Sequence, residues 1–159
     1  MPPRGRGEEM SIFPTKILLA TDGSRDAELA RSTAVDLANS TNSELHVVTV
    51  APGYPSFDVR KPEVVEQLRE QAEEILEDQI KKIEQQGGKV VEKHLRIAGR
   101  HRADQIVQVA EDIGVGLIVM GSRGLGGVRR ALMGSVSDSV VRHAHCPVLV
   151  VRPESEQAA

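Results

Sequence analysis

The sequence predicts an α/β fold, a single domain in which a mostly parallel, doubly wound sheet carries helices on both faces. Short apolar runs alternate along the chain with longer stretches whose apolar residues recur at helical spacing, the pattern of consecutive βαβ units. Aromatic residues are scarce, with no Trp, one Tyr and two Phe, so Val, Ile, Leu and Ala must form the core. A length of 159 residues suits one domain, and no internal repeat indicates a second.

Five apolar runs are the expected strands of this sheet. The fourth is unbroken in its apolar character, which is typical of a strand buried on both faces. The third is more polar than the others, which favours a position at the edge of the sheet. The five runs cover Lys16–Ala20, Leu45–Val50, Val90–Ile97, Gly116–Met120 and Val148–Val151.

Four amphipathic stretches separate these strands and are the expected helices. The charged residues of the second and longest helix are interpreted as a solvated face. For the last helix we expect Ser135 to be the N-cap, with Asp138 completing an arrangement that resembles a capping box. The helices begin after Thr21–Ser24, at Pro62, near Ala103 and at Ser135, and they end near Asn42, at Gln86, at Gly114 and near His143.

Composition limits the classes of function. We expect residues 1–11 to be a disordered tail, 12–152 the domain and 153–159 a flexible tail. A net charge of −3 with interspersed acidic and basic residues argues against nucleic-acid binding. Cys146 is the only cysteine, so no intrachain disulfide is possible. No apolar run reaches the length of a membrane span and no signal peptide is evident, so we expect a cytoplasmic protein that binds no membrane.

The stretch 120–137 combines a buried strand, a glycine-rich loop and a helix start, an arrangement that can cradle phosphate groups. On residues alone, a mobile connection is an equal alternative. The glycines do not match the dinucleotide fingerprint G-x-G-x-x-G. Gly88-Lys89 is followed by Val90 rather than Ser or Thr, which excludes a P-loop there.

The loop does match the pattern Gly121-x2-Gly124-x9-Gly134-Ser135, and here the sequence resembles the ATP-binding branch of the universal stress protein family. The resemblance extends from about Lys16 to about Arg152 and includes Thr21-Asp22-Gly23-Ser24 and the closing run Cys146–Val151. It implies a Rossmann-like fold with strand order 3-2-1-4-5. The first and fourth strands then lie side by side where the sheet reverses, the place at which such sheets bind ligands.

The resemblance also implies which residues contact ATP, which we expect to bind together with Mg²⁺. Asp22 lies at the nucleotide in relatives, although on its own it is typical of an Asx turn or helix cap. The backbone of Val50 reads the adenine edge, and the glycines let the main chain approach the ribose and phosphates. Gly134, Ser135 and Val136 present N–H groups to the phosphates. The full set is Ala20, Thr21, Asp22, Val50, Met120, Gly121, Arg123, Gly124, Gly134, Ser135, Val136 and Ser137.

Several other residues are candidates for charge or metal-binding roles. Arg129 and Arg130 carry positive charge in the loop, and Ser137 with Asp138 is a candidate helper for a divalent ion beside the phosphates. We predict no dedicated metal site, because there is no carboxylate cage. His143-x-His145-Cys146 contains ligand-type residues, but no second cluster accompanies it to complete a zinc site. His101 opens a helix and is interpreted as a surface residue.

Three functions remain open. The first is an ATP-binding stress-response or signalling protein with slow or no hydrolysis, because no catalytic base stands out. The second is a weak ATPase or nucleotidyl transferase, and the third a dimeric scaffold that binds no nucleotide. The apolar run Val148–Val151 falls at a sheet edge in the implied order, and we expect it to pair with a second copy in a homodimer. The downstream protein partner is unknown.

Overall fold

The computed structural model describes residues 11–52, 61–99, 101–123 and 133–154. The expected tails, 1–11 and 153–159, therefore lie almost entirely outside the described residues. The elements are β1 (Lys16–Ala20), α1 (Arg25–Thr41), β2 (Glu44–Ala51), α2 (Pro62–Gln85), β3 (Val90–Ile97), α3 (Arg102–Ile113), β4 (Leu117–Gly121), α4 (Ser135–His143) and β5 (Val148–Val151).

The five strands form one parallel sheet in the order β3-β2-β1-β4-β5. This confirms the predicted fold class and strand order, including the edge position of the polar strand β3. Strands β1, β3 and β5 have the predicted bounds, β2 is one residue longer at each end, and β4 is displaced by one residue toward the loop. Sheets of this order bind ligands where the direction of winding reverses, which here is between β1 and β4.

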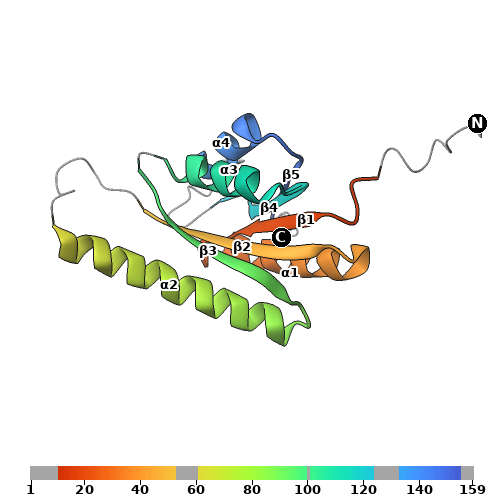
Figure 1. Ribbon diagram of the computed structural model, residues 1–159, viewed down its shortest axis with the longest axis horizontal. Helices are drawn as coiled ribbons and strands as arrows, with labels where there is room; N and C mark the ends of the chain where they lie inside the picture. Colours follow the sequence, from red (N-terminus) through yellow and green to blue (C-terminus); the bar gives the residue numbers. More distant parts are fainter. Residues whose placement is uncertain (1–10, 53–60, 100, 124–132, 155–159) are drawn as a thin grey trace, which may run out of the picture.

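The core consists of two layers, one on each face of the sheet. Figure 1 shows α3 and α4 on one face and α1 and α2 on the other. Side chains alternate between the faces, as expected for a strand. In β1, Leu18 and Ala20 pack with residues of α3 and α4, whereas Ile17 and Leu19 pack with residues of α1 and α2. All four of these β1 side chains are buried, which makes β1 the centre of the fold.

The beginning of α4 differs from the expectation. Its N-cap is Gly134 rather than Ser135, and no side chain caps the helix. Gly134 is extended (φ −74°, ψ 164°), and its N–H donates to the carbonyl of Ser122 at 2.6 Å. This bond holds Gly134 in the extended conformation of an N-cap. The cap is therefore one residue earlier than predicted, and Ser135 is the first helical residue. By contrast, Ser24 caps α1 by accepting a hydrogen bond from the N–H of Ala27.

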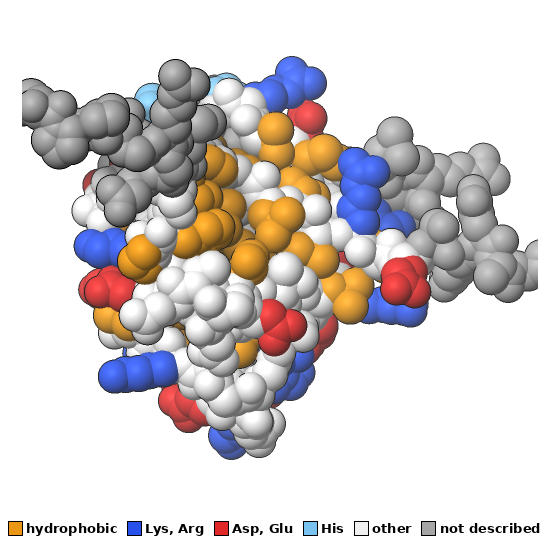
Figure 2. Space-filling model, turned by 90° about the vertical axis from the view of Figure 1, so that its right-hand side faces the viewer, with side chains coloured by type: hydrophobic (Ala, Val, Ile, Leu, Met, Phe, Trp, Pro, Cys, Tyr) orange, Lys and Arg blue, Asp and Glu red, His pale blue; other side chains and the backbone are white. Residues whose placement is uncertain are grey.

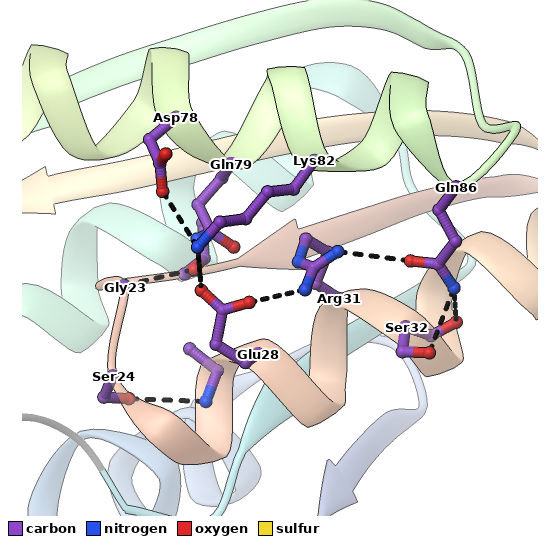
Figure 3. Close-up of polar contacts among 11 residues, drawn as sticks. Gly23, Ser24, Glu28, Arg31, Ser32, Asp78, Gln79, Lys82 and Gln86 are labelled. Atoms are coloured by element: carbon purple, nitrogen blue, oxygen red, sulfur yellow. Dashed lines mark hydrogen bonds and ion pairs between the residues drawn. The ribbon is translucent and has the colours of Figure 1, made fainter.

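The polar side of α2 is not wholly a solvated face, because part of it binds α1. Gln79 is fully buried and donates to Oε1 of Glu28 at 2.9 Å. Lys82 donates to the same oxygen at 2.9 Å, and Arg31 forms an ion pair with the other oxygen. Figure 3 shows Glu28 at the centre of this network, with Arg31 continuing it to Gln86. A polar network therefore joins the two helices.

We expect this network to make stability depend on acid pH. Burial tends to raise the pKa of Glu28, but hydrogen bonds from Lys82, Gln79 and Arg31 outweigh it and lower the pKa from 4.5 to about 2. Because the folded pKa lies below the unfolded one, the contribution is complete above pH 4.5 and disappears as the pH falls toward 2. Allowing for the partial exposure of the side chain, Glu28→Gln is expected to lower the free energy of unfolding by about 1–2 kcal/mol at pH 7.

Urea denaturation between pH 7 and pH 3 measures this effect, and Glu74→Gln is the control. Glu74 lies on the exposed side of α2, so its loss is expected to change stability by less than about 0.5 kcal/mol. The wild-type and Glu28→Gln proteins should converge in stability as the pH falls. Equal stability of the Glu28→Gln and Glu74→Gln proteins at pH 7 would contradict this account.

Candidate functional site

A cleft of about 450 Å³ opens at the carboxyl ends of the central strands. It lies where β1 and β4 run side by side, with Ala20 paired to Met120 at the end of the ladder. Eleven of the twelve expected contact residues line it, and the remaining one, Gly124, lies outside the described residues. These eleven are Ala20, Thr21, Asp22, Val50, Met120, Gly121, Arg123, Gly134, Ser135, Val136 and Ser137.

The inner part of the cleft is apolar. Strands β1, β2 and β4 contribute small and medium aliphatic side chains, and α3 contributes two more. Such a surface suits a flat ring system, because apolar walls bury it while nearby backbone groups read its edge. The apolar lining of this inner part includes Ala20, Val48, Val50, Ala103, Ile106 and Met120, all of them buried.

The outer part of the cleft is bordered by the N-termini of α3 and α4. Neither helix has a side-chain cap, since His101 and Gly134 occupy the two N-cap positions without a capping hydrogen bond. The first N–H groups of a helix have no partner within the helix, and they carry partial positive charge. Arg102 and Arg123 line the same cleft. The outer part therefore favours an anionic group such as a phosphate.

His101 and Arg102 were not among the expected contact residues. His101 is exposed, as predicted, but it also lines the cleft. Its position as the N-cap of α3, the helix that follows β3, was the available signal, because helix N-termini that follow parallel strands lie at the carboxyl edge of the sheet.

The turn after β1 is fixed by its own polar groups. The N–H of Ser24 donates to Oδ1 of Asp22 at 2.9 Å, which is an Asx turn. The N–H of Thr21 donates to the carbonyl of Val48 and ties the turn to β2. Asp22 thus has the structural role that its residue type predicts, and it also lines the cleft.

Asp26 organises the other side of the site and was missed by the sequence analysis. It is buried in the first turn of α1. Its Oδ2 accepts hydrogen bonds from the Ser122 hydroxyl at 2.8 Å, from the N–H of Arg123 at 3.1 Å and from Nε of Arg123 at 3.3 Å. Asp26 therefore fixes the chain that leaves β4 and orients the Arg123 side chain at the cleft.

Ser122 extends this connection to α4 and β5. Its carbonyl accepts from the N–H of Gly134 and from the Ser137 hydroxyl at 2.8 Å, and its N–H donates to the carbonyl of Val151. The N-terminus of α4 is thus held against the end of β4 by side chains and backbone far apart in the sequence.

The sequence profile of the universal stress protein family matches residues 14–152. The chain belongs to this family. A relative from Staphylococcus haemolyticus that carries the family name is 39% identical over 140 residues, which cover 87% of this chain and 84% of the relative. Among solved structures, hypothetical protein MJ0577 is similar with a TM-score of 0.76 and 31% identity, covering 91% of this chain and 99% of that one.

A universal stress protein from Archaeoglobus fulgidus was solved in complex with dAMP. It is similar to this chain with a TM-score of 0.64 and 26% identity, covering 89% of this chain and 99% of that one. The universal stress protein fold thus accounts for the sheet order, and at least one relative binds a nucleotide. Within the described residues, no helix is long and apolar enough to cross a membrane.

Gly121 has a packing role in this universal stress protein fold that the sequence analysis did not foresee. A Cβ at this position would lie 2.7 Å from the backbone carbonyl carbon of Asp26 and 2.9 Å from its oxygen. The glycine therefore allows α1 to approach β4, in addition to lining the cleft. A substitution at Gly121 would disturb the fold, so it cannot test ligand binding alone.

The expected contribution of Ser137 and Asp138 to a divalent ion is not supported by their contacts. The Ser137 hydroxyl is buried and lies within hydrogen-bond distance of the carbonyls of Ser122 and Gly134. Asp138 does not line the cleft, and it pairs with Arg142 at 3.1 Å. Helix geometry explains this, since a residue pair four apart on one face meets at the surface.

The His143-x-His145-Cys146 sequence does not converge on a common point. Nδ1 of His143 lies 2.8 Å from the carbonyl of Ser139, whereas His145 contacts Glu111 of α3 at 3.1 Å. Cys146 packs against the core layer beneath α3, and burial raises the pKa of its thiol. A packed, unreactive thiol is the consistent interpretation.

Proposed function

We propose that this member of the universal stress protein family binds ATP, together with Mg²⁺, in the cleft between β1 and β4. The adenine would occupy the apolar inner part, with its edge beside the backbone of Val50, and the phosphates would lie at the N-terminus of α4. The observation that carries the proposal is the pair of uncapped helix N-termini at a cleft with an apolar floor. The dAMP complex of a family relative supports a nucleotide ligand.

A triphosphate rather than a nucleoside fits the distribution of charge. Arg123 is held at the cleft by Asp26, and Arg102 lies at the start of α3. Together with the N–H groups of Ser135, Val136 and Ser137, these side chains offer several donors to phosphate oxygens. A neutral ligand would make no use of the partial positive charge at the start of α4, whereas phosphate oxygens accept from its first N–H groups.

We propose a regulatory rather than a catalytic role, with slow or no hydrolysis of the bound ATP. A general base must be placed to accept a proton from the attacking water. In the part of the site that the structure describes, Asp22 serves the Asx turn and Asp26 accepts hydrogen bonds from Ser122 and Arg123. The occupied state would instead alter a stress-response partner's access to the protein.

Calorimetric titration of protein freed of nucleotide tests the binding proposal. We expect ATP with Mg²⁺ to bind with a dissociation constant in the micromolar range, more tightly than AMP and much more tightly than adenosine. Absence of ATP binding would overturn the proposal and leave the nucleotide-independent scaffold. Turnover of ATP in the same samples, beyond slow hydrolysis, would instead favour the alternative of an enzyme that hydrolyses ATP.

We further propose that β5 pairs with β5 of a second copy in a homodimer. It is an edge strand of the sheet, all four of its residues are apolar, and all are partly exposed. Unpaired strand edges of this kind favour association with another chain. Figure 2 shows hydrophobic side chains gathered in the middle of one face of the molecule, with charged side chains around them, which is also typical of a protein that associates.

Substitution of Val150 by proline is expected to convert the dimer to a monomer. Pro147 and Val151 direct their carbonyls to β4, so by alternation the N–H of Val150 points away from β4. Proline removes this outward donor without breaking the β4–β5 ladder. Sedimentation analysis should show a monomer for Val150→Pro and a dimer for Val150→Thr, which keeps the N–H. A monomeric wild-type protein, or a dimeric proline variant, would contradict the proposed interface.

A further inference from the structure

Two histidines and a glutamate meet on the sheet at a distance from the nucleotide cleft. His46 of β2 lies opposite Glu92 of β3, and Val48 lies opposite His94. Residues two apart on a strand share a face, so all three side chains lie on the same face of the sheet. Val48 packs with residues of α3, which identifies this face as the one that carries α3. His46 lies toward the amino end of β2, whereas the cleft lies at the carboxyl end.

The three side chains are close enough to share one ion. One ligand atom from each of His46, Glu92 and His94 can be chosen so that all lie within 4.8 Å of one another. The centroids of the two imidazole rings are 6.2 Å apart, and the ring planes differ by 28°. The side chains of His46 and His94 are only 4% and 10% exposed, while that of Glu92 is 62% exposed. An ion could therefore approach from solvent past Glu92.

Each imidazole has a buried nitrogen that lacks a hydrogen-bond partner. Among the described residues, Nδ1 of His46 and Nε2 of His94 have no partner. Buried polar groups are nearly always satisfied, so two orphaned nitrogens in adjacent rings point to a ligand between them. The contact between His94 and Glu92, at 3.8 Å, is too long for a hydrogen bond.

Glu44 provides the outer contact that metal-binding histidines usually have. Its Oε2 lies 3.2 Å from Nε2 of His46. A carboxylate that accepts a hydrogen bond from one ring nitrogen keeps the proton on that nitrogen, which leaves the other, here Nδ1, with a lone pair available for a metal ion.

We propose that His46, Glu92 and His94 bind a divalent transition-metal ion, with Zn²⁺ the best match to two imidazoles and one carboxylate. Such a donor set forms tetrahedral sites in which water completes the coordination. The bound ion would join the edge strand β3 to β2. Arg96 lies two residues after His94 on the same face of β3, and its positive charge repels the ion and so limits the affinity.

Titration of metal-free, untagged protein with Co²⁺ tests the proposal, because tetrahedral Co²⁺ has strong visible absorption; Zn²⁺ calorimetry gives the affinity. We expect one equivalent to bind, and both His94→Gln and Glu92→Gln to weaken binding at least tenfold. His145→Gln removes a histidine that is 76% exposed and should bind like the wild type. Circular dichroism checks folding, and the exposed Glu92 provides a variant that does not disturb the interior.

Absence of saturable binding at one equivalent would overturn the proposal. Wild-type affinity in either His94→Gln or Glu92→Gln would overturn it as well, since each removes one of the three ligands. Because the titrations contain no nucleotide, their outcome is independent of whether ATP binds in the cleft.

Discussion

Replacement of Ser135 by glutamate is expected to weaken ATP binding by at least about 30-fold, or ~2 kcal/mol. Ser135 is the first residue of α4, exposed, and at the rim of the cleft. A carboxylate there would occupy the positive end of the helix and repel the phosphates. The same charge is favourable for the helix itself, so the folded state should be as stable as the wild type or more stable by up to about 1 kcal/mol.

Ser135→Gln is the matched control, because glutamine has the size of glutamate without its charge. We expect this variant to bind ATP within about threefold of the wild type, since the backbone N–H groups of α4 remain in place. Calorimetry measures binding, and thermal denaturation measures stability. Equal ATP affinity of the glutamate and glutamine variants would show that the phosphates do not lie at the start of α4.

Replacement of Asp26 by alanine is expected to lower the free energy of unfolding by about 2–4 kcal/mol. The change leaves the buried Ser122 hydroxyl and the N–H of Arg123 without their acceptor. It also releases the Arg123 side chain, so ATP affinity should fall in addition to stability. Urea denaturation at pH 7 measures the loss of stability directly.

Asp36→Ala on the same helix is the control for this change. Asp36 is exposed, so its replacement is expected to change stability by less than about 0.5 kcal/mol. If Asp26→Ala were as stable as Asp36→Ala, the hydrogen bonds from Asp26 of α1 to the end of β4 would not stabilise the fold as described.

The strands could be predicted closely because most of them are local apolar runs between turn residues. The sheet order and most of the cleft residues followed from the family resemblance, which placed the ends of β1 and β4 together. That placement agrees with the general rule for ligand sites in such sheets, and the pairing of Ala20 with Met120 confirms it. Which of these residues contact ATP stays a prediction.

The residues that escaped prediction take part in contacts between distant segments. Asp26 and Ser122 are 96 positions apart, and nothing local distinguishes Asp26 from any other acidic residue in a first helical turn. The packing requirement at Gly121 depends on the same approach of α1. The cap at Gly134 is likewise set by the carbonyl of Ser122, whereas the local sequence favoured Ser135.

The histidine pair illustrates the same limit. His46 and His94 belong to strands that are adjacent only because β2 pairs with β3, and the register places Glu92 opposite His46. In the sequence, His143 and His145 are the more conspicuous pair because they are near each other in the chain, but they contact different partners. Residue types that bind metals therefore indicate a site in this chain only once the sheet register is known.

Amide chemical-shift mapping by NMR, with ATP and Mg²⁺ added to nucleotide-free protein, tests the central claim most directly. We expect the largest shifts at the ends of β1, β2 and β4 and at the first turn of α4, that is, at Asp22, Val50, Gly121 and Ser135–Ser137, with little change at His94. Shifts confined to other surfaces, or no shifts at saturating ATP, would contradict the assignment of the cleft as an ATP site.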